Sequence, residues 1–160
     1  MIAYRVATET RKYGALDLSG LGAAVDPGRW NKPGQAVLYT ALSAALAMLE
    51  TVAHIDAAGL PLNKFMIEIT IPDEVWARRE VLDLARLDPT WKAVPAGLAG
   101  ERAGSEWIDT RRSALLLVPS VIVPEESCLL VNPAHADAQT LSARVLRKVE
   151  YDSVFRSGGR

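Results

Sequence analysis

The chain has 160 residues, of which 49% are apolar and 23% are charged, and its formal net charge is −1. This near-neutral balance argues against generic nucleic-acid binding, which normally depends on an excess of cationic side chains. No apolar run is long enough to span a bilayer, and the N-terminus lacks the charged start and apolar core of a signal peptide. We therefore expect one soluble, cytoplasmic domain that binds neither nucleic acid nor membrane directly.

The inventory of metal-binding side chains is small. Cys128 is the only cysteine, so no disulfide can form within the chain, which fits a reducing compartment. Structural zinc sites normally need four closely spaced ligands, whereas Cys128, His54 and His135 are scattered along the chain. We expect no metal site, and the sequence leaves the roles of His54 and His135 open.

The first predicted elements are a strand and a long loop. Residues 2–7 alternate in a way that predicts a strand with Ile2, Tyr4 and Val6 on the buried face and Arg5 on the opposite, non-core face. Residues 18–36 then contain enough glycine and proline to predict an extended loop. Loops of this length inside a compact domain are often functional.

A short β-prone run at 36–41 precedes the clearest helical pattern of the chain. Thr40 or Ser43 is a suitable N-cap, and Gly59 a suitable C-terminal stop. Glu50 and His54 are four residues apart, which makes them neighbours on one side of this helix. The apolar stripe of the predicted helix consists of Leu42, Leu46, Leu49, Val52 and Ala53.

The rest of the chain is richer in strands. Residues 65–72 predict a strand with Phe65, Ile67, Ile69 and Ile71 on one face. Residues 73–97 fit either a capped helix or broken structure, and 104–114 fit a helix. Two buried strand segments follow at 115–124 and 128–133, and 145–155 adds a strand or a helix. Because strands and helices do not alternate regularly, we predict the α+β class.

Five polar side chains stand in positions where their residue types are unexpected: Arg29, Tyr39, Glu50, His54 and Ser120. Each also has an ordinary structural explanation. Arg29 could be a surface salt-bridge residue, Tyr39 a core residue with one bonded hydroxyl, and Ser120 a turn hydroxyl. Glu50 interrupts an apolar run, where a carboxylate needs a partner. His54, one turn on, is a candidate for that partner, in either a structural or a catalytic pair.

Two stretches nevertheless resemble a known family. "GRWNKPGQAVLYTALSAALAMLETVAH" and the later "VPSVIVPEESCLLVNPAH" are similar to the RES domain, the toxin of bacterial toxin-antitoxin pairs, named for an arginine, a glutamate and a serine. By position these are Arg29, Glu50 and Ser120, and Tyr39 matches the family's tyrosine. Pro27 stands where a second glycine often precedes "GRWN"; this stiffens the loop and removes no functional group.

The resemblance implies a single RES domain over residues 1–160, with mixed sheets and flanking helices like those of ADP-ribosyltransferases, that consumes NAD+ as a substrate without a metal. Glu50 would stabilise the oxocarbenium-like state that forms when nicotinamide leaves the ribose. Arg29 would bind the pyrophosphate. Tyr39 would border the nicotinamide-ribose end, and Ser120 would donate to phosphate or amide.

Three further side chains are weaker candidates for this site. Arg5 could make a second phosphate contact, while Trp30 and His54 could support the cleft. Which molecule accepts ADP-ribose is not decided by these residues.

Three classes of function remain at this stage. The first is a toxin that cleaves NAD+ and transfers ADP-ribose to a protein, with water or phosphate as alternative acceptors that would deplete NAD+. The second is a metal-free ribonuclease toxin using Glu50, His54 and Arg29. The third is a non-catalytic binding module. The resemblance also implies a cognate antitoxin with a helix-turn-helix part and a toxin-binding region that blocks the active site.

Overall fold

The structure is a computed structural model that describes residues 1–53 and 63–150. Its elements confirm the predicted α+β class. Within the described ranges, no helix is long and apolar enough to cross a membrane. The strands are β1 (Ile2–Thr8), β2 (Leu38–Ala41), β3 (Lys64–Thr70), β4 (Glu80–Val81), β5 (Leu115–Pro119), β6 (Ser127–Val131) and β7 (Ser142–Lys148). The helices are α1 (Leu21–Val25), α2 (Ala44–Ala53), α3 (Asp73–Ala77) and α4 (Leu98–Thr110), with short 3₁₀-helices η1 (Leu84–Arg86), η2 (Pro89–Lys92) and η3 (Ala136–Thr140).

The described strands form one mixed sheet in the order β4-β5-β6-β2-β1-β3-β7. β4 and β5 are parallel, and all other neighbours are antiparallel. The short strand β2 joins the two halves of the sheet, because it pairs with β1 on one side and β6 on the other. Because β2 leads into α2 and its neighbour β6 pairs with β5, the start of α2 lies near the segment that joins β5 to β6.

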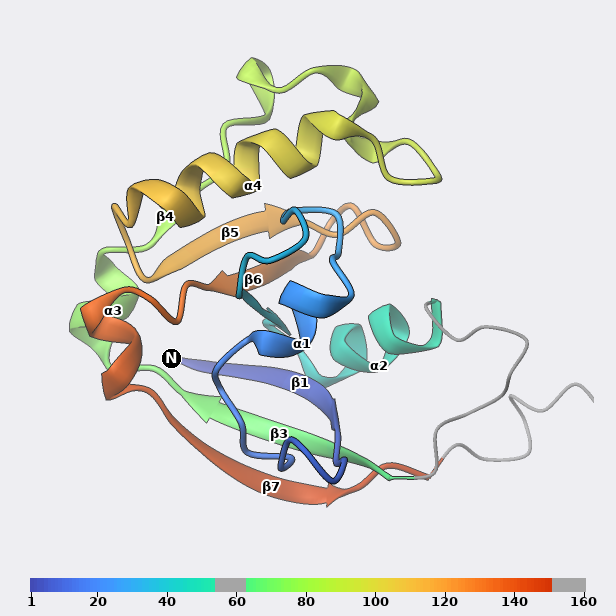
Figure 1. Cartoon of the computed structure of the whole chain (residues 1–160), viewed down its shortest axis with the longest axis vertical. Helices are drawn as coiled ribbons and strands as arrows, with labels where there is room; N and C mark the ends of the chain where they lie inside the picture. Colours follow the sequence, from blue (N-terminus) through green and yellow to red (C-terminus); the bar gives the residue numbers. More distant parts are fainter. Residues whose placement is uncertain (54–62, 151–160) are drawn as a thin grey trace, which may run out of the picture.

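The two long helices lie on the same face of this sheet. α2 packs on β1 and β2 through Leu46 and Ala47, and α4 packs along β5 and β6 through Trp107 and Ile108 (Figure 1). The register pairs Tyr4 with Ala41 and Ala41 with Cys128, so these side chains share that face. We call it the helix face, defined by Tyr4, Tyr39, Ala41, Cys128 and Leu130.

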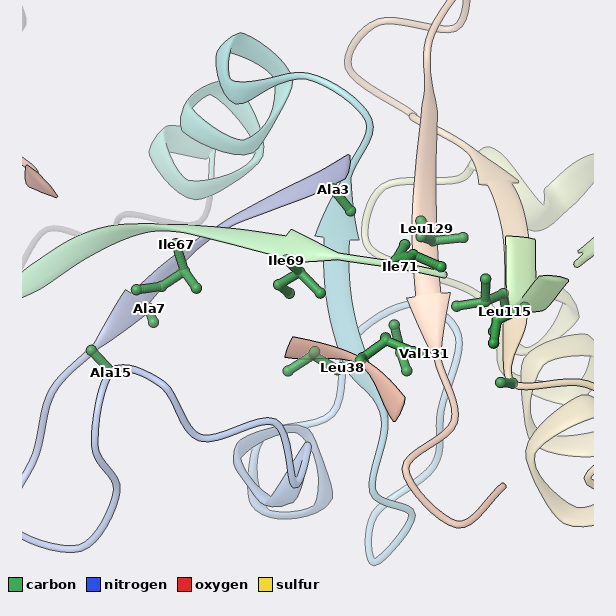
Figure 2. Close-up of a cluster of buried hydrophobic side chains, with 13 residues drawn as sticks. Ala3, Ala7, Ala15, Leu38, Ile67, Ile69, Ile71, Leu115, Leu129 and Val131 are labelled. Atoms are coloured by element: carbon green, nitrogen blue, oxygen red, sulfur yellow. The ribbon is translucent and has the colours of Figure 1, made fainter. Parts of the chain in front are cut away.

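The opposite face carries the largest cluster of buried apolar side chains and is called here the core face. Figure 2 shows members from β1, β2, β3, β5 and β6 gathered in this cluster, including Ala3, Leu38, Ile69 and Leu129. The predicted strand at 65–72 is confirmed, since Ile67, Ile69 and Ile71 all belong to the cluster. The later strand segments are confirmed as β5 and β6, with β7 adding an edge strand.

The first strand confirms the predicted element but not its predicted orientation. The fully buried side chains of β1 are Ala3 and Ala7, which lie on the same face as Arg5. Tyr4 and Val6 are half-buried on the helix face, against residues of α2. The prediction that Arg5 lies on a non-core face was wrong. Because both faces of the sheet are covered, alternation alone does not identify the core face.

Helix α2 follows its predicted start but turns a different side to the sheet. Ser43 is the N-cap, because its Oγ accepts a hydrogen bond from Leu46 N at 3.1 Å. Leu46 and Ala47 are buried, whereas Leu49 is 44% exposed and Ala53 is also exposed, so the predicted stripe was wrong at both positions. Leu42, the first residue of the predicted stripe, lies before the start of α2 and is not part of the helix surface.

Residues 73–97 adopt the broken structure of the two alternatives, with α3, β4, η1 and η2 in place of one helix. The next helix begins at Leu98, six residues before the predicted position of 104. Its early part contains Gly100 and Gly104, whose poor helix propensity concealed the helix start. The predicted loop at 18–36 likewise contains the short helix α1.

Candidate active site

The carboxylate of Glu50 is held by donors from two other segments. Glu50 lies in the last described turn of α2 and is half-buried. Its Oε1 accepts hydrogen bonds from Ser120 Oγ at 2.7 Å and from Cys128 Sγ at 3.4 Å. Two positions predicted from separate parts of the sequence, Glu50 and Ser120, are therefore in direct contact.

Ser120 sits in the turn that follows β5 and is only 1% exposed. Its Oγ accepts hydrogen bonds from the backbone N–H groups of Ile122 at 3.1 Å and Val123 at 3.0 Å. A hydroxyl has one proton to donate, and here Ser120 donates it to Glu50. In this arrangement the Ser120 proton points at the carboxylate, whereas the family resemblance implied that Ser120 would donate to phosphate or amide.

The side chain of Arg29 is anchored at one nitrogen. Its Nη1 donates to two backbone carbonyl oxygens, those of Trp91 and Ala93. Burial lowers the pKa of the Arg29 guanidinium from its ordinary value, while the negative charge of Glu50 opposes that change, with a smaller contribution from Tyr39. Arg29 and Glu50 thus lie near enough for their charges to interact.

Arg29 is carried by a turn that Asn31 organises from within. Asn31 is 1% exposed, and its Oδ1 accepts hydrogen bonds from Gly28 N at 2.9 Å and Tyr39 Oη at 2.8 Å. Its Nδ2 donates to the carbonyls of Ala23 at 2.8 Å and Gln35 at 3.0 Å. Because the amide uses both ends, Asn31 fixes the path of the backbone on either side of Arg29.

Tyr39 connects this turn to the sheet. Its hydroxyl donates to Asn31 Oδ1 and accepts a hydrogen bond from Trp30 N at 3.0 Å. A Cβ on Gly28 would come within 2.7 Å of the Tyr39 ring, so the turn requires glycine at position 28 for close approach. Burial raises the pKa of the Tyr39 phenol, although the hydrogen bond from Trp30 and the charge of Arg29 oppose this.

Helix α4 supports the same turn from the outside. A Cβ on Gly104 would lie 2.0 Å from the carbonyl oxygen of Trp30, and one on Gly100 would lie 3.0 Å from that of Arg29. The Trp30 side chain is buried, and its ring stacks on Trp91 with centroids 5.9 Å apart. Trp30 therefore supports the site through packing.

Comparison with known proteins agrees with the sequence resemblance. A family model of the RES domain matches residues 2–153. The chain belongs to the RES domain family. It is 54% identical over 149 residues to the Prs ADP-ribosylating toxin of Sphingobium sp. (strain YBL2), covering 93% of this chain and 92% of the relative. It is 38% identical over 147 residues to Toxin Res of Yersinia enterocolitica, covering 91% and 92%.

Among solved structures, the crystal structure of the M. tuberculosis MbcT-MbcA toxin-antitoxin complex contains a chain similar to this one. The TM-score is 0.62, and the match covers 96% of this chain and 85% of that chain. At 23% sequence identity this similarity concerns the fold.

Among the described residues, Arg5 is a predicted site residue of this RES domain that does not join the cluster. Arg5 lies on the core face, opposite to Tyr39 and Cys128, and its Nη1 donates to the carbonyl of Asp17 at 3.0 Å. His54 and the predicted helix stop at Gly59 lie outside the described residues. His135 caps η3, since its Nδ1 accepts a hydrogen bond from Asp137 N at 3.1 Å.

Three contributors to the candidate site of the RES domain were not predicted from the sequence. Cys128 was considered only as a lone thiol, although its alternation with the buried Leu129 places it on the helix face. Asn31 lies two residues beyond Arg29 in a turn rich in glycine and proline, and no residue pattern marked it as the buried amide that organises this turn. Gly104 was part of a predicted helix start, and the four-residue spacing of Gly100 and Gly104 was the available signal for close packing.

A cavity of about 520 Å³ lies elsewhere in this RES domain, between α1 and η3. Leu38 and Val131 line it, which places it on the core face, away from Tyr39. Its lining contains no charged side chain. Because a pyrophosphate and a developing positive charge both need charged partners, the cluster around Glu50 is the better candidate for the active site.

Proposed function

We propose that this chain is a toxin that cleaves NAD+ and transfers ADP-ribose to a protein. The observation that carries the proposal is the meeting of Glu50 and Ser120, with Arg29 close enough to interact with the same carboxylate. A negative and a positive group on one side of the sheet match the two needs of this chemistry. These are stabilisation of a cationic sugar and binding of a pyrophosphate.

Glu50 would act on the ribose. When the bond between ribose C1′ and the nicotinamide nitrogen breaks, the electron pair leaves with nicotinamide and C1′ becomes positively charged. A nucleophilic group of the acceptor then bonds to C1′ and loses its proton. A carboxylate held in place before the reaction stabilises this positive charge without reorganising, which is where electrostatic catalysis is most effective. Ser120 would keep the carboxylate in that orientation.

Arg29 would bind the pyrophosphate. The guanidinium is planar and stays charged at every relevant pH, and it can present a second edge while Nη1 remains bonded to Trp91 and Ala93. Tyr39 would border the nicotinamide-ribose end with its ring, because its hydroxyl is already bonded to Asn31 and Trp30. This assigns the hydroxyl of Tyr39 to loop support and the ring to ligand contact.

The acceptor is proposed from the relative at 54% identity. That protein is named as a Prs ADP-ribosylating toxin, and its match extends over 93% of this chain. We take Prs as the first acceptor to test. Transfer to water or phosphate uses the same cleavage step and differs only in the nucleophile, so the products of the reaction separate these outcomes.

The deciding experiment uses NAD+ that is labelled in its ADP-ribose part and measures where the label goes. The purified chain is incubated with purified Prs, and separately with a bacterial lysate, and label is measured on protein and as free ADP-ribose. We expect label on Prs. Glu50→Gln should reduce it by about 100-fold, the typical cost of losing one electrostatic contributor to a transition state.

Glu125→Gln is the matched control, since Glu125 is an exposed carboxylate in the turn between β5 and β6. It should retain wild-type labelling, and circular dichroism should show both variants folded. If the label appears only as free ADP-ribose or ADP-ribose phosphate, and not on protein, the chain depletes NAD+ and does not modify a protein. RNA cleavage without NAD+ would favour the ribonuclease alternative, and growth inhibition unchanged by Glu50→Gln would favour a binding module.

We also propose that a cognate antitoxin covers the Glu50 and Arg29 cluster and carries a helix-turn-helix part. Support comes from the structural similarity to a chain of a toxin-antitoxin complex. The purified complex should neither bind nor consume NAD+ in calorimetric and turnover assays. Undiminished NAD+ binding by the complex would contradict a blocked active site.

A further inference from the structure

The proposed chemistry leaves one side chain at the site without a role, the thiol of Cys128. Cys128 lies on β6 between Ala41 of β2 and Val118 of β5, on the helix face. It packs against the cluster that joins α2 to the sheet, which includes Leu46. The thiol is therefore held between regular elements and directed toward α2.

The hydrogen bonds at Glu50 show what this thiol does. Cys128 Sγ donates to Glu50 Oε1 at 3.4 Å, and Ser120 Oγ donates to the same oxygen at 2.7 Å. We propose that Cys128 is a positioning residue for Glu50: its thiol and the Ser120 hydroxyl together fix the carboxylate in the orientation that the reaction uses. The catalytic part of this proposal rests on the proposed function.

The surroundings of Cys128 keep it a donor. Burial raises the pKa of the Cys128 thiol, and the charge of Glu50, the hydrogen bond to Glu50 and the charge of Glu126 act in the same direction. Tyr39 packs against the same buried cluster as Cys128, which includes Leu130. The thiol therefore keeps its proton at neutral pH, and only the protonated form can donate to a carboxylate.

A second donor matters because one hydrogen bond does not fix a carboxylate. The carboxylate of Glu50 is carried by several rotatable side-chain bonds, so each added donor narrows the orientations that it can adopt. Donors from the β5–β6 turn and from β6 approach that oxygen from two separate segments, which restricts this rotation. The expected effect of Cys128 is therefore on the chemical step and not on NAD+ binding.

The kinetic test compares Cys128→Ala with Cys128→Ser. Alanine removes the donor, and we expect kcat to fall about fivefold with KM for NAD+ unchanged. This is the scale of one ordinary hydrogen bond, because a thiol is a weak donor even to a carboxylate. Serine restores a donor and should recover most of that loss. Ser127→Ala on the same strand is the control and should leave kcat unchanged. Wild-type kcat in Cys128→Ala, or equal losses in the alanine and serine variants, would overturn the proposal.

A spectroscopic test works without turnover. Because Cys128 is the only cysteine, the infrared S–H stretching band of the chain belongs to it alone. Hydrogen bonding to a carboxylate lowers that frequency, so the wild-type band should lie below that of Glu50→Gln, whose side chain is a weaker neutral acceptor. An identical band in the two proteins would show that the thiol does not donate to Glu50 and would overturn the positioning role.

The two tests separate the two proposals. A shifted S–H band in a chain that does not consume NAD+ would refute the proposed function and support the contact of Cys128 with Glu50. Turnover of NAD+ with an unshifted band would support the function and overturn the role of Cys128.

Discussion

The two ends of the candidate site are built in different ways. At the carboxylate end, Glu50, Ser120 and Cys128 come from α2, the end of β5 and β6, so the strands and the helix place them. At the guanidinium end, Arg29 belongs to a turn without regular structure. That turn is held by the buried amide of Asn31 and by close packing on α4.

This difference implies different sensitivities. The carboxylate end shares the hydrogen bonds of the sheet, so changes there should act on the chemical step while the fold persists. The guanidinium end depends on a few specific contacts, so changes to its support should move Arg29 and weaken NAD+ binding.

Replacing Arg29 should have the largest effect on binding. Arg29→Ala removes the phosphate contact, and we expect KM for NAD+ to rise about 100-fold, within the range for truncating one member of a hydrogen-bonded charge pair. Arg29→Lys should recover only part of this, because an ammonium lacks the planar pair of donors. Steady-state kinetics measure both variants. Arg86→Ala is the control, since Arg86 is 88% exposed and its one salt bridge among the described residues is with Asp83. A comparable rise in KM for Arg86→Ala would show that the effect is not specific to Arg29.

Gly104→Ala should break the support of the turn from α4. The added Cβ would lie 2.0 Å from the Trp30 carbonyl oxygen, so helix and turn must separate. We expect the free energy of unfolding to fall by about 2 kcal/mol and KM to rise while kcat is kept. Urea unfolding and kinetics measure these quantities. Gly22→Ala has no atom within 4 Å of its new Cβ and should be near neutral; equal stability of the two variants would contradict the close packing.

Tyr39→Phe tests the role of the hydroxyl with a smaller expected change. The substitution leaves the ring and removes the link between Asn31 and Trp30. We expect a loss of about 1 kcal/mol in stability and a KM about fivefold higher, with kcat retained. Tyr13→Phe in the N-terminal loop serves as the control. A kcat that collapses while KM stays constant would instead give the hydroxyl a direct part in catalysis.

The smallest effect is a pH dependence that differs between the two ends. Burial raises the pKa of Cys128 at one end and of Tyr39 at the other. Below their ordinary values of about 8.5 and 10, both groups are protonated in the folded and unfolded states. Above those values the unfolded chain releases protons that the folded chain retains, so stability falls as pH rises.

We expect a loss of less than about 1 kcal/mol near pH 9, measured by urea unfolding across that range. Cys128→Ala should flatten the decline that begins near pH 8.5, and Tyr39→Phe the part above about pH 10. Stability that is constant through both ranges would show that neither group is held protonated by the fold.

The predictability of the fold varied with the local pattern. Ile67, Ile69 and Ile71 indicated β3 correctly because strict alternation depends only on the geometry of a strand. The predicted orientation of β1 was wrong because the buried residues Ala3 and Ala7 are small and less apolar than Ile2, Tyr4 and Val6 on the other face. Burial of the face that carries Arg5 depends on elements distant in sequence. The start of α4 was not predicted because Gly100 and Gly104 have low helix propensity. Their lack of a side chain allows the close contacts with Arg29 and Trp30.

The sequence by itself determined the α+β class, most of the strands and, through its resemblance to the RES domain, the family that the matching model then showed. It also supplied the candidates Arg29, Glu50 and Ser120. Only the tertiary structure decided that Ser120 gives its proton to Glu50, that Cys128 joins them, and that Arg5 lies on the other face. Periodicity records which residues one element buries, whereas these contacts depend on strand register and on packing between segments distant in sequence.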